Sequence, residues 1–166
     1  MSLYDIPIHP ESPRIVNAII EIPKDTNIKY EYDPLLNIFK LDRTLCSAMT
    51  YPASYGFIPN TIADDDDPLD IIVFNAAPIK TGCLVECKVI GVLDMVDSGQ
   101  KDWKVLGVPT SHIKEYNDLG DIDPIFLKIA KNFFSHYKDL DKKEVEVNQW
   151  HEKNFARKIV DESVKR

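Results

Sequence analysis

The sequence predicts an α+β fold in which short strands form a small β-barrel and helices follow them. Short stretches of alternating or continuous apolar residues, typical of strands, fill the first two thirds of the chain. Apolar residues at helical spacing occur in the last third. No linker, internal repeat or low-complexity segment divides the 166 residues, which are enough to bury a core. We therefore expect a single domain over residues 1–166.

Most of the expected strands are bounded by proline, glycine or a turn pair. The clearest is residues 15–22, whose polarity alternates and which Pro23 ends. Asp33 and Pro34 mark a turn between the next two strands. Residues 48–59 hold prolines, a glycine and tyrosines, and we expect a long structured loop there. The expected strands are residues 15–22, 29–32, 38–43, 71–74, 83–97 and 102–106.

A hairpin is expected between the last two of these strands. Its turn is residues 98–101, so Asp97 and Asp102 would flank the loop and face each other. Like charges directly opposite across a hairpin are unfavourable. The pair therefore indicates either a shared cation or a solvated hairpin tip. Cys83 and Cys87 lie on the apolar face of the long strand and are expected in the core.

Two helices are expected in the last third of the chain. Asp123 is a favourable N-cap and Pro124 a favourable first helical residue. The apolar residues behind them recur at helical spacing, so they are expected to face the core. They are Ile125, Phe126, Ile129, Ala130, Phe133, Phe134 and Tyr137. A weaker helical pattern runs from about residue 148 to the end of the chain.

An acidic run is the most unusual stretch: residues 64–70 contain five aspartates and no lysine or arginine. At about 5 Å and an effective dielectric constant of about 20, each pair of carboxylates repels by roughly 3 kcal/mol. A solvated loop tolerates such a run, and so does a site with a cation among the oxygens. In an extended segment Asp65 and Asp67 point to one side and the even-numbered aspartates to the other. Pro68 then leads into an apolar strand, so Asp70 begins a rigid element.

Composition and charge argue against several classes of protein. The formal net charge is −7, to which residues 64–70 contribute −5, so the chain is a poor general binder of nucleic acid. No stretch approaches the length of a membrane span, and the first residues lack the basic start and apolar run of a signal peptide. Three cysteines without a paired framework fit a reducing compartment. We expect a cytoplasmic protein without nucleic-acid or membrane partners.

Several common phosphate and metal motifs are absent from the sequence. The six glycines form no glycine-rich phosphate loop, and the four histidines form no metal-binding pair at helical spacing. The acidic run does not fit a calcium-binding helix-loop-helix motif, because Asp70 stands where that motif needs glycine. What remains is a set of carboxylates with cations and phenols beside them, which suits metal-assisted hydrolysis of a phosphate compound. The acidic residues are Glu21, Glu31, Asp65, Asp67, Asp70, Asp97 and Asp102. The cations and phenols are Lys29, Arg43, Tyr51, Tyr55, Lys104, Tyr137 and Lys138.

The run from Asp65 to Ile71 resembles the signature of the first family of soluble inorganic pyrophosphatases. Further matches follow in the same order over nearly the whole chain. They are Glu21-Ile22-Pro23, Lys29-Tyr30-Glu31, Asp42-Arg43, Tyr51-Pro52, Tyr55-Gly56, Gly91-Val92-Leu93, Asp97, Asp102, Lys104 and Phe133 to Leu140. The two-histidine motif of the unrelated second family is absent. The resemblance implies a five-stranded OB-like barrel with C-terminal helices packed on it, and a homohexamer, as in the short prokaryotic type.

The resemblance also implies a reaction, the Mg²⁺-dependent hydrolysis of pyrophosphate to two orthophosphates. Several Mg²⁺ ions would bind, and a water bridging two of them would be the nucleophile, because it loses a proton more readily than bulk water. Asp67 would be the catalytic base. The metal ligands would be Asp65, Asp70, Asp97, Asp102 and Glu31, with Glu21 and Tyr51 supporting them from behind. The residues binding phosphate oxygens would be Lys29, Arg43, Tyr55, Lys104, Tyr137 and Lys138.

Two other classes of protein compete with this interpretation. An OB-like module for single-stranded nucleic acid would need exposed aromatic residues and a basic groove, which the acidic cluster opposes. A different metal phosphohydrolase, acting on nucleotides or monoesters, would use the same residue types. Only the order of the matched motifs favours a pyrophosphatase over that second class.

Overall fold

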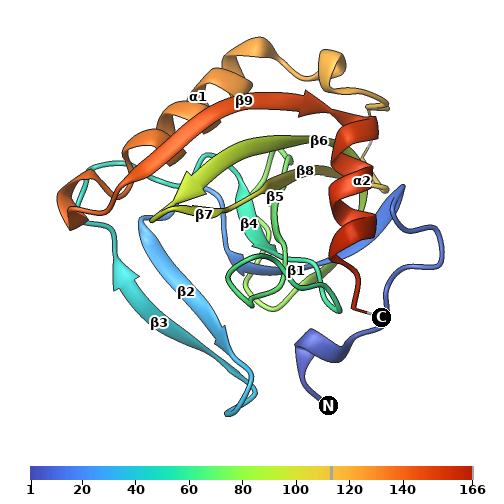
Figure 1. Cartoon of the computed structure of the whole chain (residues 1–166), viewed down its shortest axis with the longest axis horizontal. Coiled ribbons are helices and arrows are strands. Elements are labelled where there is room, and N and C mark those ends of the chain that lie inside the picture. The colour runs from blue at the N-terminus through green and yellow to red at the C-terminus, as the bar shows by residue number, and fades with distance from the viewer. Residues whose placement is uncertain (113, 166) are drawn as a thin grey trace.

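The computed structural model describes residues 1–112 and 114–165. Its central feature is a ring of five strands in which every strand pairs with two others (Figure 1). In order around the ring, the strands are β1 (Ile15–Ile22), β4 (Ser54–Phe57), β5 (Asp70–Val73), β8 (Lys104–Pro109) and β6 (Leu84–Asp97). The pair β5–β8 is parallel and the other neighbours are antiparallel. The ring and the helices beyond it confirm the predicted α+β fold with a small five-stranded β-barrel.

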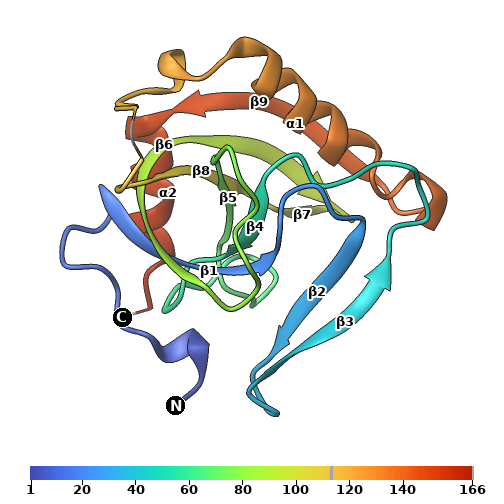
Figure 2. The same cartoon turned by 180° about the vertical axis from the view of Figure 1, so that it is seen from behind.

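The remaining elements extend this ring. The long strand β6 also pairs with β7 (Gln100–Lys101) and β9 (Val145–Glu152). A separate hairpin of β2 (Ile28–Asp33) and β3 (Ile38–Thr44) projects from the ring beside β1 (Figure 2). The helices are η1 (Leu3–Asp5), η2 (Leu119–Asp121), α1 (Pro124–His136), η3 (Asp139–Asp141) and α2 (Lys153–Ser163). Within the described residues, no helix is long and apolar enough to cross a membrane.

The core consists of two main clusters on opposite faces of the ring strands. Successive residues such as Ile71 and Ile72 alternate between the clusters, so β5 is buried on both faces. Phe133 of α1 belongs to one cluster and Val160 of α2 to the other. Because burying a large apolar side chain stabilises by about 1.5–3 kcal/mol, these contacts hold both helices against the strands. This rigid frame carries the site described below.

Two strands differ from the sequence prediction. Strand β4 lies inside residues 48–59, where a loop is expected. Its four residues are all buried, so they show no alternation of polarity. Strand β9 is not predicted at all, and the last helix begins at Lys153 rather than near residue 148. β9 carries several polar side chains and is a strand because it pairs with β6.

The first helix confirms its predicted start and corrects its predicted face. The Asp123 carboxylate accepts a hydrogen bond from the Ile125 N–H at 2.8 Å, and Pro124 is the first helical residue. However, Ile125 is 63% exposed and Ile129 is 51% exposed, whereas both are predicted in the core. Only the side of α1 that faces the sheet is covered. The prediction for Cys83 is also wrong, because this residue precedes β6 in a turn and is exposed.

The hairpin after β6 is tighter than predicted. Its turn is only Ser98 and Gly99, both with positive φ, as in the two-residue turns that suit hairpins. Asp97 therefore pairs with Gln100 instead of lying opposite Asp102. The N–H of Asp102 donates to the Met95 carbonyl at 2.9 Å. The two aspartates still reach one pocket, because the chain bends back after β7.

Candidate active site

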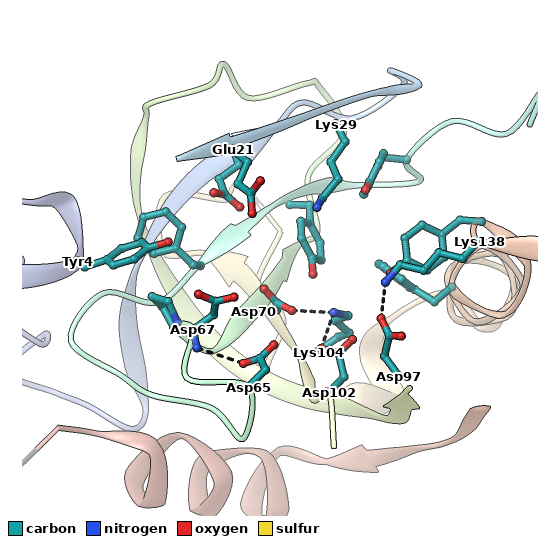
Figure 3. Close-up of a pocket in the computed structure, with 17 residues that line it drawn as sticks. Tyr4, Glu21, Lys29, Asp65, Asp67, Asp70, Asp97, Asp102, Lys104 and Lys138 are labelled. Carbon is teal, nitrogen blue, oxygen red and sulfur yellow. Dashed lines mark hydrogen bonds and ion pairs between the residues drawn. The ribbon is translucent and has the colours of Figure 1, made fainter. Parts of the chain in front are cut away.

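One pocket of about 160 Å³ collects nearly all of the residues predicted to carry the chemistry (Figure 3). Its carboxylates come from ring strands, the acidic turn, the hairpin after β6 and strand β2. Its phenols and ammonium groups come from η1, β2, β4 and the loop before it, β8 and the end of α1. The predicted residues in its lining are Glu21, Lys29, Glu31, Tyr51, Tyr55, Asp65, Asp67, Asp70, Asp97, Asp102, Lys104, Tyr137 and Lys138. Arg43 is the predicted site residue that does not line it.

Lys104 lies at the centre of the carboxylates. Asp70 and Lys104 are partners in the parallel pair β5–β8, which places their side chains together. The Lys104 ammonium lies 2.6 Å from the Asp70 carboxylate and 2.6 Å from the Asp102 carboxylate, and the side chain is only 3% exposed. Burial acts to lower the pKa of Lys104, but the charges of Asp70 and Asp102 raise it well above its usual range. Lys104 therefore stays positively charged and stabilises two carboxylates.

The acidic run is a turn and not the extended segment that would place Asp65 and Asp67 on one side. The Ala63 N–H donates to the Asp67 carbonyl at 2.8 Å, and Asp66 has a φ of 67°. The Asp67 N–H donates to the Asp65 carboxylate at 3.2 Å. The turn still directs Asp65 and Asp67 to the pocket and leaves Asp64 and Asp66 out of its lining. Burial and the neighbouring charge of Asp65 raise the pKa of Asp67.

A second lysine covers the opposite side of the pocket. Lys138, just after α1, forms an ion pair with Asp97 (Figure 3). Burial acts to raise the pKa of Asp97, but the hydrogen bond and charge of Lys138 outweigh it and lower that pKa. Lys29 lies in the pocket lining with its ammonium 3.0 Å from the Asp42 carboxylate. The lysines thus reach the pocket from three separate elements.

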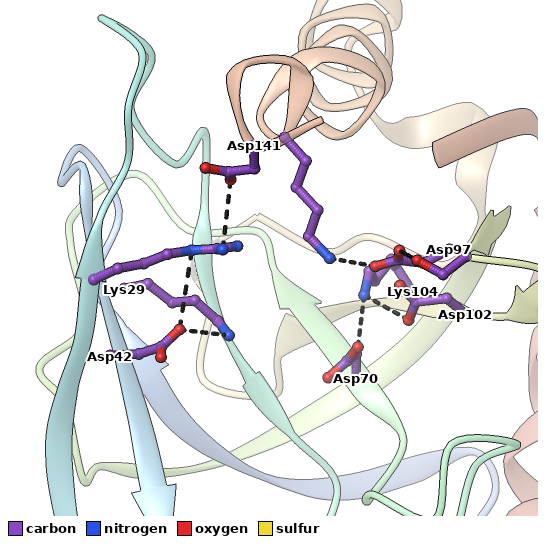
Figure 4. A network of polar contacts seen from close by, with 10 residues as sticks. Lys29, Asp42, Asp70, Asp97, Asp102, Lys104 and Asp141 are labelled. Carbon is purple, nitrogen blue, oxygen red and sulfur yellow. Dashed lines mark hydrogen bonds and ion pairs between the residues drawn. The ribbon is translucent and has the colours of Figure 1, made fainter. Parts of the chain in front are cut away.

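Arg43 lies beside the pocket and not in its lining. Its guanidinium is 3.4 Å from the Asp141 carboxylate and 4.0 Å from that of Asp42 (Figure 4). Its Nε is buried and has no hydrogen-bond partner among the described residues. In this arrangement Arg43 ties β3 to the segment after α1. Its predicted contact with phosphate stays a prediction.

Glu21 occupies the back of the pocket on β1. The Tyr32 N–H donates to its carboxylate at 2.8 Å. Burial raises the pKa of Glu21 to about 8, although the hydrogen bond from Tyr32 opposes the shift. The nearby charges of Asp70 and Glu31 also raise it. At neutral pH this carboxyl group is therefore largely protonated, unlike an ordinary surface glutamate.

Three buried tyrosines form an aromatic wall of the pocket. Tyr51 packs on Phe133 with ring centres 4.7 Å apart, and Tyr55 lies 5.8 Å from Phe134. Burial raises the pKa of Tyr51, Tyr55 and Tyr137 above the usual phenol range. All three phenols are therefore neutral at physiological pH and able to donate hydrogen bonds.

A family model described as "Inorganic pyrophosphatase" matches residues 18–166. The chain belongs to this family. An inorganic pyrophosphatase of Geobacillus stearothermophilus is 45% identical over 155 residues, which cover 92% of this chain and 94% of the relative. That of Halalkalibacterium halodurans is 44% identical over 152 residues, covering 90% and 93%. The crystal structure of inorganic pyrophosphatase from Thermus thermophilus superposes with a TM-score of 0.95 at 37% identity, covering 99% of this chain and 97% of that one.

Tyr4 lines the pocket but belongs to none of the sequence motifs that resemble the family. It lines the pocket together with Phe57, Pro68 and Phe134. From the sequence, residues 1–14 are only a proline-containing lead-in, because they show neither alternation nor helical spacing. No sequence signal separates Tyr4 from the chain's other tyrosines. Only the folded arrangement brings it beside the carboxylates.

The pocket fits a hard divalent cation in its chemistry. Seven carboxylates line it, and oxygen ligands of this kind are what Mg²⁺ binds. The raised pKa values of Glu21, Asp67 and Asp102, each with burial as the largest cause, report crowded, poorly hydrated carboxyl groups. Among the described residues, however, no three potential ligands lie close enough to form a ready-made metal site. The lysine ammonium groups lie among these carboxylates instead.

Proposed function

We propose that this chain hydrolyses inorganic pyrophosphate to two orthophosphates in an Mg²⁺-dependent reaction that uses a metal-activated water. The observation that carries the proposal is a single pocket with seven carboxylates and three lysines in a member of the inorganic pyrophosphatase family. Carboxylates suit divalent cations, and lysines suit phosphate oxygens. The pocket therefore holds groups for both parts of a magnesium-pyrophosphate complex.

The metal-binding residues in this proposal are carboxylates from the acidic turn, β5, the hairpin after β6 and β2. When bound, Mg²⁺ supplies charge that polarises phosphoryl oxygens and makes a bound water more acidic. Glu21 and Tyr51, at the back and on the aromatic wall, support the ligands and shield them from bulk water. The ligands are Asp65, Asp70, Asp97, Asp102 and Glu31.

Substrate binding is assigned to the lysines and phenols. Lys29, Lys104 and Lys138 neutralise the charge of pyrophosphate and the charge that develops on the leaving phosphate. Tyr55 and Tyr137 stay protonated and donate hydrogen bonds to phosphate oxygens. In the structure, Lys104 and Lys138 are paired with aspartates. We expect phosphate oxygens to replace these partners, which frees the carboxylates for the metal. Arg43 is assigned to phosphate as well and would have to leave Asp141.

Asp67 is assigned the role of general base. Burial and the charge of Asp65 raise its pKa, and a carboxylate with a higher pKa accepts a proton more readily. Asp67 lies in the turn at the edge of the pocket, where an attacking water can reach it. In this proposal it orients that water and takes its proton.

We also propose a cytoplasmic homo-oligomer, most simply a hexamer. The support is the resemblance to the short prokaryotic type and the exposed apolar side chains of Ile125 and Ile129 on α1. Apolar surface of this kind is often covered by another subunit. Analytical ultracentrifugation tests the proposal, because a monomer at micromolar concentration would contradict it.

The experiment that tests the activity measures phosphate release from pyrophosphate, ATP and a phosphate monoester, each with Mg²⁺ and with chelator. We expect fast release from pyrophosphate with Mg²⁺ and little from the other two substrates. Preference for ATP or the monoester would favour a different phosphohydrolase. No Mg²⁺-dependent release from any substrate would contradict an enzymatic role.

A further inference from the structure

A short segment near the start of the chain, Ser2 to Ile6, lies against the pocket and is held by several hydrogen bonds. The Leu3 N–H donates to the Tyr32 hydroxyl at 2.9 Å, and the Ser2 hydroxyl lies 3.2 Å from the same oxygen. The Asn60 N–H donates to the Tyr4 carbonyl at 2.8 Å. These bonds come from two different parts of the fold. The segment is therefore a fixed part of the structure next to the site.

The ring of Tyr4 is held in one orientation by other aromatic rings. It meets Tyr32 edge-on at 5.2 Å and Phe57 edge-on at 4.9 Å between ring centres. Edge-to-face contacts at such distances are favourable and restrict rotation of the ring. With its ring fixed in this way, Tyr4 lines the pocket on the side of Asp67 and Glu21 (Figure 3).

The Tyr4 phenol is half-buried, and the ionisable side chains nearest to it are carboxyl groups and Tyr32. The charged groups that act most strongly on it are Glu21, Asp67 and Glu31. Burial and these carboxylates raise the pKa of Tyr4, so the phenol keeps its proton. A neutral phenol beside carboxylates can only be favourable as a donor, since its O–H then points toward an acceptor oxygen.

Tyr32 connects this segment to the back of the pocket. Its hydroxyl holds the Ser2–Ile6 segment, while its N–H donates to the Glu21 carboxylate at 2.8 Å. The Tyr32 hydroxyl also donates to the Asn37 side chain at 2.6 Å. The same residue thus orients Glu21 and fixes the segment that presents Tyr4. Tyr4 and Glu21, which line the same pocket, therefore both depend on Tyr32 for their position.

We propose that Tyr4 is a positioning residue of the pyrophosphate reaction, whose phenol O–H donates toward the carboxyl groups of Glu21 and Asp67 and holds them in working orientation. This inference rests on the proposed function, since Asp67 is the assigned base. It adds a donor from outside the motifs that carry the family resemblance. The phenol contributes to turnover through these carboxyl groups, without contacting the phosphate itself.

The test begins with Tyr4→Phe, which removes the hydroxyl and keeps the ring contacts with Tyr32 and Phe57. We expect an unchanged melting temperature and a KM within about twofold of wild type. The kcat should fall about three- to tenfold, which is the effect expected from losing one hydrogen bond. Tyr116→Phe is the matched control, because Tyr116 packs on Phe74 outside the pocket. The control should match wild type in both constants.

A double-mutant cycle distinguishes positioning from a general structural effect. Tyr4→Phe is combined with Asp67→Ala and, separately, with Glu21→Ala, because alanine removes the acceptor oxygens that an asparagine or glutamine would keep. If the phenol acts through one of these carboxyl groups, then Tyr4→Phe should change kcat less than twofold in the variant that already lacks that carboxyl group. Full additivity in both backgrounds, or a wild-type kcat for Tyr4→Phe alone, would overturn the role of Tyr4. A wild-type enzyme without pyrophosphate turnover is a separate outcome that overturns the proposed function.

Discussion

At the scale of single residues, the pocket offsets the repulsion of its carboxylates with lysines from distant parts of the chain. The acidic turn contains no lysine, but the parallel pairing of β5 and β8 places Lys104 beside Asp70. Lys138 reaches Asp97 from the end of α1. Three lysines cannot balance seven carboxylates. Burial first, and then the charges of neighbouring carboxylates, raises the pKa of Glu21 and of Asp67.

The five aspartates of residues 64–70 should not be equivalent. We expect Asp65→Asn and Asp70→Asn to weaken Mg²⁺ binding about tenfold or more, because each removes a charged ligand. Asp67→Asn should retain Mg²⁺ and lose most of the turnover, about a hundredfold or more for a general base. Asp64→Asn and Asp66→Asn should remain close to wild type, since neither side chain lines the pocket.

Calorimetric Mg²⁺ titration and pyrophosphate turnover on these five variants check the prediction. Asparagine is a suitable replacement at position 66, because Asp66 has a φ of 67° and asparagine tolerates this conformation. A loss of turnover at Asp64 or Asp66 as large as that at Asp67 would show that the turn acts only through its total charge.

Glu21 should make the metal-free protein less stable as the pH rises. Burial raises its pKa to about 8 in the folded state, from 4.5 for an ordinary glutamate. Between these values the folded state binds a proton that the unfolded state has released, so the contribution of Glu21 to stability falls as pH increases. Glu21→Gln should flatten this decline and be more stable than wild type near pH 8 by roughly 2–4 kcal/mol.

Urea unfolding in chelator, at several values from about pH 5 to about pH 8, measures this effect. The variant and the wild type should differ least at the acidic end, because about pH 5 lies close to the ordinary glutamate pKa of 4.5 and little of the difference in stability has developed there. A difference that is constant across the range would show that Glu21 does not titrate in this way.

The sequence indicates most site residues by motif, but two positions show where that reasoning ends. Arg43 matches the family pattern, yet its guanidinium pairs with Asp141 outside the pocket lining. The motif fixes residue identity, while the direction of a long side chain depends on its partners in the fold. Tyr4 belongs to no motif and reaches the pocket only through its packing on Tyr32 and Phe57.

At the scale of elements, β4 illustrates why a central strand can be invisible in the sequence. Gly56 pairs with Ile20 of β1, and a Cβ at this position would collide with the Ile19 carbonyl oxygen and lie 2.9 Å from the Ile20 Cα. The glycine is required by close approach of two backbones, although glycine is a poor strand former. The patterns that succeed are those of β1, with its alternation, and α1, with its cap and first proline.

Gly56→Ala should therefore be strongly destabilising. Separating β4 from β1 also displaces Tyr55, so we expect a loss of about 3 kcal/mol or more, or failure to accumulate as soluble protein. Gly120→Ala is the control, because nothing lies within 4 Å of a Cβ at that position. Melting temperatures of the two variants check this, and equal stability would contradict the account of the β1–β4 contact.

At the scale of the whole molecule, local patterns predict strands and helices but not the closure of the ring. Closure of the ring depends on the pairing of β1 with β6, two strands that are far apart in the sequence. It also depends on the parallel pairing of β5 with β8. Only the family resemblance predicts the five-stranded barrel. Strand β9 also depends on its long-range partner, since its stability as a strand comes from pairing with β6.

The ring strands and the segments attached to them bring the carboxylates of the site together only in the folded protein, so metal binding should stabilise the whole fold. Relief of repulsion among Asp65, Asp70 and Asp102 favours the folded state, in which alone they lie together. At a free Mg²⁺ concentration about a hundredfold above its dissociation constant, linkage gives about 2.7 kcal/mol. For a chain of this size that is roughly 5–10 °C in melting temperature.

Activity should disappear after thorough chelation and return with Mg²⁺. Differential scanning calorimetry in chelator and in Mg²⁺, at matched ionic strength, measures the shift. Asp70→Asn should lose most of it and Asp64→Asn should keep it. An unchanged melting temperature together with full activity in chelator would contradict the assignment of these carboxylates to a metal.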